Sequence, residues 1–269
     1  MGKFRSMPSF HELPPLERPT DRPPRRPFTR RPLDDARFCL RQTLRLLAVV
    51  PLCVGGMWWH CGCPGRDVAV NWARARFFPR TVDQAVARVQ SARPEVRALA
   101  ESVGGSLRIL VFKHEGRVEV SAPGWPAPRV YPMTARSGAL GPKLREGDGQ
   151  IPEGLYRVES LNPNSLYHLS LRLDYPNDFD RARAAEDGRT ALGGDIMVHG
   201  SDRSVGCIAV GDPAIEEIFC CAAAVGPSNV AVLIAPYDLR RGRQPSLEPA
   251  SAPPWYPALL ASLRDSLRD

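Results

Sequence analysis

The chain has 269 residues, 43% of them hydrophobic, which is enough for one medium-sized core with extensions. Its net charge of +7 is uneven, because residues 1–80 carry 15 Lys and Arg against 6 Asp and Glu, whereas residues 81–269 carry 21 against 23. The main domain therefore lacks the clustered cations that bind phosphates, so we expect no nucleic-acid partner.

The first 45 residues predict a disordered arm. They are rich in Arg and Pro, as in "RPTDRPPRRPFTRRP", and poor in apolar residues. A segment of this composition cannot bury enough surface to offset the entropy lost on ordering. A basic flank of a membrane segment is favoured over a tail that binds nucleic acid.

Residues 46–65 predict a membrane anchor. This stretch, "LLAVVPLCVGGMWWHCGCPG", contains no Asp, Glu, Lys or Arg and is about as long as a helix that crosses a bilayer. Five arginines between residues 30 and 45 precede it, which predicts that the N-terminus is inside. The alternative is a cleaved signal segment. Both predictions place the residues beyond about 66 outside the cytoplasm.

The next part of the chain predicts a linker, a helical segment and then strands. Apolar residues at helical spacing fill the second half of 66–104, and Pro94 divides them. Alternating residues around "HEGR" predict a hairpin over 107–121. Further segments are read as strands at 129–134, 154–160 and 166–173, and as a polar loop over the site at 174–192.

The strand expected at 166–173 has two unlike faces. Tyr167 and the leucines after it alternate with His168, Ser170 and Arg172. The first set is expected in the core. The second set is too polar for an ordinary core, so it either meets water or lines a cleft.

The last elements surround a histidine and a cysteine. "DIMVHG" predicts a short strand that ends at His199, and "CIAV" predicts a second one. Asp212 is expected to cap a helix that stops near Gly226, with Pro213 at the first helical position. A buried strand at 229–236 and a Pro-rich tail over 237–269, with a short helix at 257–268, complete the chain.

His199 and Cys207 lie eight positions apart with glycines beside both. A thiol is a useful nucleophile only as thiolate, and a neighbouring imidazole can take its proton to form an ion pair. This pairing predicts that Cys207 reacts with alkylating reagents well below the pKa of a free thiol. The alternative is that the spacing is accidental and that the cysteine is an inert part of the core.

The turn between the two residues supplies further candidates. Gly206 leaves room for a substrate carbonyl near the backbone N–H groups around Cys207, which then act as an oxyanion hole. Ser204 can hydrogen-bond within the turn or orient the imidazole. The nearby acidic residues have no recognisable ligand spacing, so the sequence predicts no metal site and no cofactor.

Several ordered motifs resemble one enzyme family. "MVHG" followed by "SVGC" resembles the signature of the L,D-transpeptidase (YkuD-type) catalytic domain. The short spacing is similar to the murein transpeptidase-like branch of Gram-negative bacteria. Blocks that agree with this branch are "SGALGPKLREGDGQIPEGLY", "LNPNSLYHLSL", "YPNDFD" and "AIEEIF". The resemblance covers about residues 105–236.

This resemblance implies a mainly β catalytic domain, a β-sandwich or barrel with a few short helices. It implies a periplasmic enzyme that acts on peptidoglycan stem peptides. His199 matches the general acid and base of the family, Cys207 its nucleophile, and Ser204 with Gly206 its turn. Typical members have Arg where this chain has Ala209, which puts donor binding in doubt, although the short-spaced branch often lacks that Arg.

The function we expect is transfer of a stem peptide from a Cys207 thioester to an amine, for crosslinking or protein attachment. Hydrolysis of the same type of bond, for example to release a wall-linked lipoprotein, is the first alternative. A non-catalytic wall-binding module is the second. Lys143 and Arg145 are candidates for holding substrate carboxylates, and His168 and Gly200 for lining the substrate cleft.

Overall fold

The structure is a computed structural model that describes residues 66–241 and 252–268. The arm predicted at 1–45 and the anchor predicted at 46–65 lie outside these residues. No helix within the described ranges is long and apolar enough to cross a membrane. The described residues from Val70 onward belong to one compact unit.

Eight strands form one sheet in the order β3-β2-β1-β8-β4-β5-β6-β7. The pairs β1–β8 and β6–β7 are parallel and the other neighbours are antiparallel. The strands are β1 (Leu107–Phe112), β2 (Arg117–Ser121), β3 (Arg129–Pro132), β4 (Gly154–Ser165), β5 (His168–Leu173), β6 (Met197–His199), β7 (Ile208–Ala209) and β8 (Val230–Ala235).

The two ends of this sheet meet. Just beyond β3, Ala135 forms an antiparallel bridge with Ala209 of β7, and the Thr134 N–H donates to the Ala209 carbonyl at 2.9 Å. The sheet is therefore curled, and its ends join two residues after Cys207. The prediction of a mainly β region is confirmed, and its form is one curled sheet whose two ends meet.

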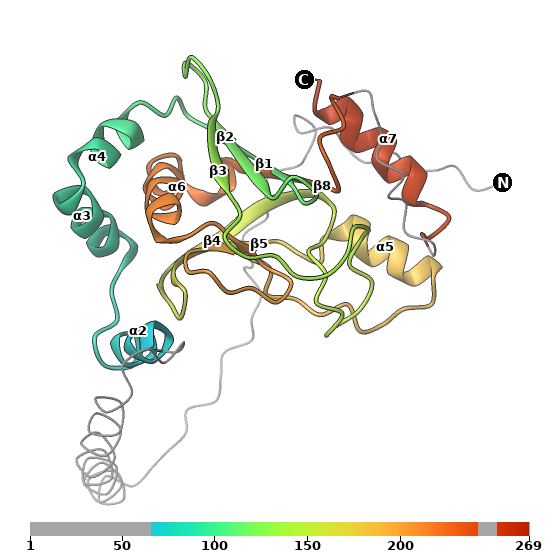
Figure 1. Cartoon of the computed structure of the whole chain (residues 1–269), viewed down its shortest axis with the longest axis horizontal. Coiled ribbons are helices and arrows are strands. Elements are labelled where there is room, and N and C mark those ends of the chain that lie inside the picture. The colour runs from blue at the N-terminus through green and yellow to red at the C-terminus, as the bar shows by residue number, and fades with distance from the viewer. Residues whose placement is uncertain (1–65, 242–251, 269) are drawn as a thin grey trace, which may run out of the picture. The chain divides into compact units, whose positions relative to one another are not determined.

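Each face of the sheet packs against its own helix (Figure 1). Side chains of a strand alternate between faces, so Ile109 and Val111 join the core that contains α6 (Asp212–Val225). Leu110 and Phe112 join the core that contains α7 (Tyr256–Ser266). Strand β1 is thus buried on both sides and holds the two cores together.

The remaining helices differ partly from expectation. They are α2 (Arg66–Phe77), α3 (Val82–Ala92), α4 (Pro94–Glu101), α5 (Asp178–Glu186) and the short η1 (Pro227–Asn229). The break at Pro94 is confirmed, because this residue begins α4. The linker expected at 66–80 contains α2, and the loop expected at 174–192 contains α5. A capping box between Asn177 and Asp180 begins α5. Ala184 is the one buried residue of this helix, so the sequence contains no apolar stripe that would predict it.

A buried lysine joins the sheet to the loop that follows β3. The Lys113 ammonium donates to the carbonyls of Gly141 and Ile151 at 2.8 Å each, and to the Glu153 carboxylate at 2.9 Å. The second Glu153 oxygen accepts from the Tyr256 hydroxyl of α7 at 2.6 Å. The Lys113 side chain is 4% exposed and the Glu153 side chain 0%. This cluster fixes both ends of the segment 141–151.

We expect Lys113→Met to lower the free energy of unfolding by about 3–5 kcal/mol, because it leaves a buried carboxylate without its counter-charge. Urea denaturation followed by circular dichroism measures the loss. The double variant Lys113→Met/Glu153→Gln removes both charges and should lose less than the single variant. A double variant that is less stable than Lys113→Met would contradict this account.

Candidate active site

His199 ends β6 and Cys207 directly precedes the neighbouring strand β7, at the joined end of the sheet. Strands β6 and β7 run parallel, with Val198 opposite Ile208 and His199 opposite Ala209. Cys207 is the residue immediately before β7. Among the described cysteines it is partly exposed, whereas Cys220 and Cys221 on α6 are buried. Cys207 is therefore the described cysteine that a substrate can reach.

Two contacts fix the imidazole of His199. Its Nδ1–H donates to the Gly200 carbonyl at 2.6 Å, which leaves Nε2 as the nitrogen with a free lone pair. The ring of Tyr167 stacks on it with centroids 4.8 Å apart and planes at 28°. His199 is 2% exposed, so its neighbours hold it in one orientation. A neutral imidazole with this tautomer can accept a proton at Nε2.

The turn before Cys207 is held from two sides. The Ser204 hydroxyl accepts from the Cys207 N–H at 3.1 Å and donates to the Cys207 carbonyl at 2.6 Å. The Gly206 N–H donates to the Ser137 hydroxyl at 2.6 Å, and that hydroxyl donates to the Gly149 carbonyl at 2.7 Å. Both N–H groups thus already have hydroxyl acceptors. The oxyanion-hole role of Ser204 and Gly206 stays a prediction. In that role, a substrate oxyanion would compete with the two serine hydroxyls for the backbone N–H groups.

The Cys207 sulfur faces a carbonyl. The thiol donates to the Asp195 backbone oxygen at 3.5 Å. Burial raises the pKa of the Cys207 thiol; the backbone amide of Met197 opposes this rise and the Asp195 carboxylate adds to it. The ammonium of Lys143 is a further influence that lowers the thiol pKa.

The same burial acts in the opposite direction on the base. It lowers the pKa of His199, and the hydrogen bond to Gly200 opposes that shift only in part. Desolvation disfavours the charged form of each group, so a neutral thiol and a neutral imidazole are the stable pair in this structure. The resting ion pair expected from the sequence stays a prediction, against which the burial of both groups acts.

The predicted carboxylate-binding residues have different surroundings. Lys143 is buried, and its ammonium is bound to Asp148 at 2.6 Å and to the Arg145 carbonyl at 2.9 Å. Arg145 is exposed. Lys143 thus organises its own loop and acts on Cys207 through its charge, while Arg145 is turned to solvent.

The remaining predicted residues also have clear positions. His168 lies at the start of β5 and its Nε2 is 2.9 Å from Glu216 of α6, so it holds the hairpin to the helix. Gly200 packs so closely that a Cβ would lie 2.5 Å from the Asp212 carboxylate. That carboxylate accepts from the Ser201 N–H at 2.7 Å instead of capping α6, whose N-cap is Gly211.

Three contributors to the site are missing from the sequence analysis. Tyr167 was expected in the core, but it lies in the turn between β4 and β5, is partly exposed, and stacks on His199. Ser137 is separated from Gly206 by 69 positions. Asp195 contributes a backbone carbonyl at a φ of +56°, which only the folded chain reveals. The leucine pattern beside Tyr167 concealed its role.

Comparisons with known proteins show which family this part of the chain is similar to. The model of the L,D-transpeptidase catalytic domain family (YkuD) matches residues 106–228. A curated relative, "Putative L,D-transpeptidase YafK" of Escherichia coli K12, is 34% identical over 145 residues. This match covers 51% of the chain and 56% of the relative, so the chain spans about half the length of that protein.

Solved structures show weaker likeness. The helical cell shape determining protein Pgp2 from Campylobacter jejuni is 22% identical with a TM-score of 0.39, over 53% of this chain and 56% of that one. Mycobacterium tuberculosis L,D-transpeptidase 1 is 17% identical with a TM-score of 0.29, over 48% and 62%. The sequence matches confirm the resemblance to the L,D-transpeptidase catalytic domain family that the motifs indicate, over residues 106–228.

The neutral resting pair predicts an unusual pH profile. The rate of alkylation of Cys207 by iodoacetamide should continue to rise at pH values where a free cysteine has already reached its plateau, because the raised pKa keeps thiolate scarce. Mass spectrometry of the modified peptide measures the rate. At a given pH, Asp195→Asn should react faster and Lys143→Met more slowly. A plateau below the range of a free thiol would instead demonstrate an ion pair.

Proposed function

We propose that this protein is a Cys207-dependent acyltransferase that acts on peptidoglycan stem peptides. The observation that carries the proposal is the arrangement of the β6–β7 pair, in which a partly exposed thiol lies beside a strand whose His199 is held at Nδ1. The family of residues 106–228 supports acyl transfer as the class of reaction.

In the proposed reaction, Nε2 of His199 takes the thiol proton as the Cys207 sulfur attacks the carbonyl of the third stem residue. The peptide bond to the terminal D-residue breaks, and the leaving amine takes that proton from His199. A thioester now joins Cys207 to the stem peptide. An acceptor amine attacks this thioester, gives its proton to His199, and releases the Cys207 thiolate. The thiolate then takes up that proton from His199.

The surroundings expected from the sequence belong to the same proposal. Residues 46–65 anchor the chain in the inner membrane, and the catalytic domain faces the periplasm. The acceptor is a second stem peptide or a protein amine. If water attacks the thioester instead, the enzyme is a hydrolase, and a wall-linked lipoprotein becomes a candidate substrate.

The decisive assay incubates the full-length protein with purified muropeptides and analyses the products by mass spectrometry. We expect new amide-linked species with the wild-type protein and none with Cys207→Ala. His199→Ala should be slower by about 10²–10⁴-fold, the usual contribution of a general base. Cys220→Ala is the matched control because that thiol is buried in α6.

Two results would change the proposal. Products that are only shortened or released would assign the hydrolase function. Undiminished turnover by Cys207→Ala would rule out Cys207 as the nucleophile.

The activity should also persist below pH 6.5, because burial lowers the pKa of His199 and keeps its imidazole neutral there.

A further inference from the structure

Exposed apolar side chains gather on α2 and just after it. Of the seven large hydrophobic side chains that are exposed in the described ranges, four are close together in the chain: Val70, Trp72, Phe77 and Phe78. Trp72 is 54% exposed and Phe78 is 76% exposed. The rings of Trp72 and Phe77 meet edge to face, with centroids 6.3 Å apart. These side chains therefore form an apolar surface that the domain itself does not cover.

The helix adds nothing to either core of the sheet. No side chain described in α2 is buried, and the bonds that attach the helix to the domain are polar. The Asn71 amide donates to the Leu166 carbonyl at 3.1 Å, and the Asn164 amide exchanges two hydrogen bonds of 2.8 Å with the Arg80 backbone. A helix of 12 residues is marginal in water unless an apolar face packs against something. The exposed face of α2 lacks that packing.

The charge on this part of the chain has one sign. Residues 70–80 contain Arg74, Arg76 and Arg80 and no acidic residue. The guanidinium carbon of Arg76 lies 5.9 Å from the centroid of the Phe77 ring, so a cation borders the aromatic surface directly. Burial, and then the charges of neighbouring arginines, lower the pKa of Arg80. An anionic surface beside these cations would offset their mutual repulsion.

We propose that α2 lies in the surface of an anionic lipid bilayer, with Trp72, Phe77 and Phe78 among the acyl chains and the arginines at the headgroups. Helices that bind a bilayer surface combine aromatic side chains with basic residues in this way, and Trp is enriched at the boundary between headgroups and acyl chains. At 12 residues, α2 is too short to cross a bilayer and lies along it instead.

The position of α2 in the chain favours a bilayer over a protein partner. The apolar stretch 46–65, which the sequence predicts to enter a membrane, ends immediately before α2 begins. The inference shares this predicted anchor with the proposed function and is otherwise independent of the proposed reaction. Helix α2 is bonded to the turn at Leu166, and the next residue, Tyr167, stacks on His199. One turn therefore joins the lipid-binding helix to the candidate active site.

The test is hydroxyl-radical footprinting of the full-length protein, in which mass spectrometry measures the oxidation of individual side chains. The protein is reconstituted in vesicles of phosphatidylcholine and in vesicles of equal parts phosphatidylcholine and phosphatidylglycerol. We expect the anionic vesicles to lower the oxidation rates of Trp72 and Phe78 at least about threefold relative to the neutral ones, because three arginines near an anionic surface contribute on the order of a hundredfold to local binding. The half-buried Trp125 should be oxidised equally in both.

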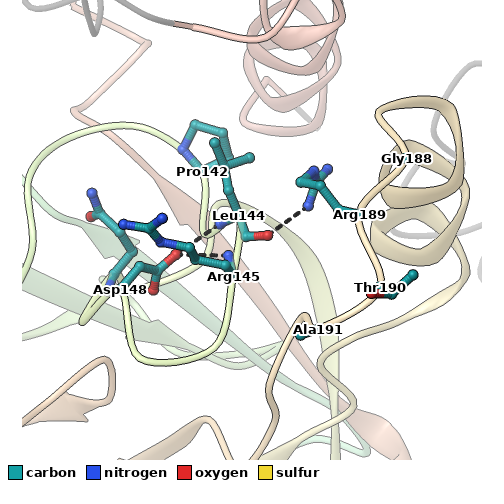
Figure 2. A pocket seen from close by; sticks show the side chains of 9 residues that line it. Pro142, Leu144, Arg145, Asp148, Gly188, Arg189, Thr190 and Ala191 are labelled. Carbon is teal, nitrogen blue, oxygen red and sulfur yellow. Dashed lines mark hydrogen bonds between the residues drawn. The ribbon is translucent and has the colours of Figure 1, made fainter.

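Two double variants separate the arginines of α2 from charge in general. Arg74→Gln/Arg76→Gln should remove most of the difference between the two kinds of vesicle, and the helix is retained because glutamine and arginine have similar helix propensities. Arg97→Gln/Arg145→Gln removes the same charge from exposed positions elsewhere and should keep the full difference. Arg97 lies on α4, and Arg145 lines a pocket of about 640 Å³ formed by the loops after β3 and α5 (Figure 2).

Equal oxidation of Trp72 and Phe78 in neutral and anionic vesicles would overturn the inference, even if residues 46–65 hold the protein in both. A rate that falls with rising protein concentration in the absence of vesicles would also overturn it, because a second copy of the chain then covers the face. So would an Arg74→Gln/Arg76→Gln variant that keeps the full difference. The muropeptide assay is a separate measurement, so either proposal can fail while the other stands.

Discussion

The site depends on one buried ammonium. Lys113 directly follows β1, and its ammonium donates to two backbone carbonyls at the ends of the segment 141–151 and to the Glu153 carboxylate just beyond it. Without this cation, both buried carbonyls and the buried carboxylate would lose a hydrogen-bond donor, which is costly in the interior. The same segment contains Gly149, which is joined to Gly206 through Ser137, so the turn before Cys207 depends on a contact in the interior of the fold.

Desolvation is the second constraint on the site. Burial shifts the pKa values of Cys207 and His199 in opposite directions, and each shift favours the uncharged form. A neutral thiol reacts more slowly with oxidants and alkylating reagents than a thiolate does. In the proposed reaction, the charges therefore separate only when a substrate is bound and the imidazole accepts the thiol proton.

The alternation and spacing of apolar residues in the sequence predicted those strands and helices that bury one apolar face. Alternation predicted the hairpin of β1 and β2, and the two short strands predicted around His199 and Cys207 are β6 and β7. Helix α5 was not predicted, because Ala184 is its one buried residue and the helix therefore has no apolar stripe. Tyr167 was misplaced because a turn interrupts its strand, and Ser137 was missed because its partner is distant in sequence. The periodicity of apolar residues along the chain cannot predict a contact between the two ends of the sheet, because the curl of the sheet and the register of its strands determine that contact.

The contact between the two ends of the sheet has a consequence for how the protein folds. The hydroxyl that holds the turn before the cysteine comes from the opposite end of the sheet, 69 positions earlier in the chain. Contacts between such distant segments require most of the intervening chain to be ordered first. A partly folded molecule can therefore contain every strand and still lack the ordered turn before Cys207. Competence for chemistry thus coincides with the completed ring of strands.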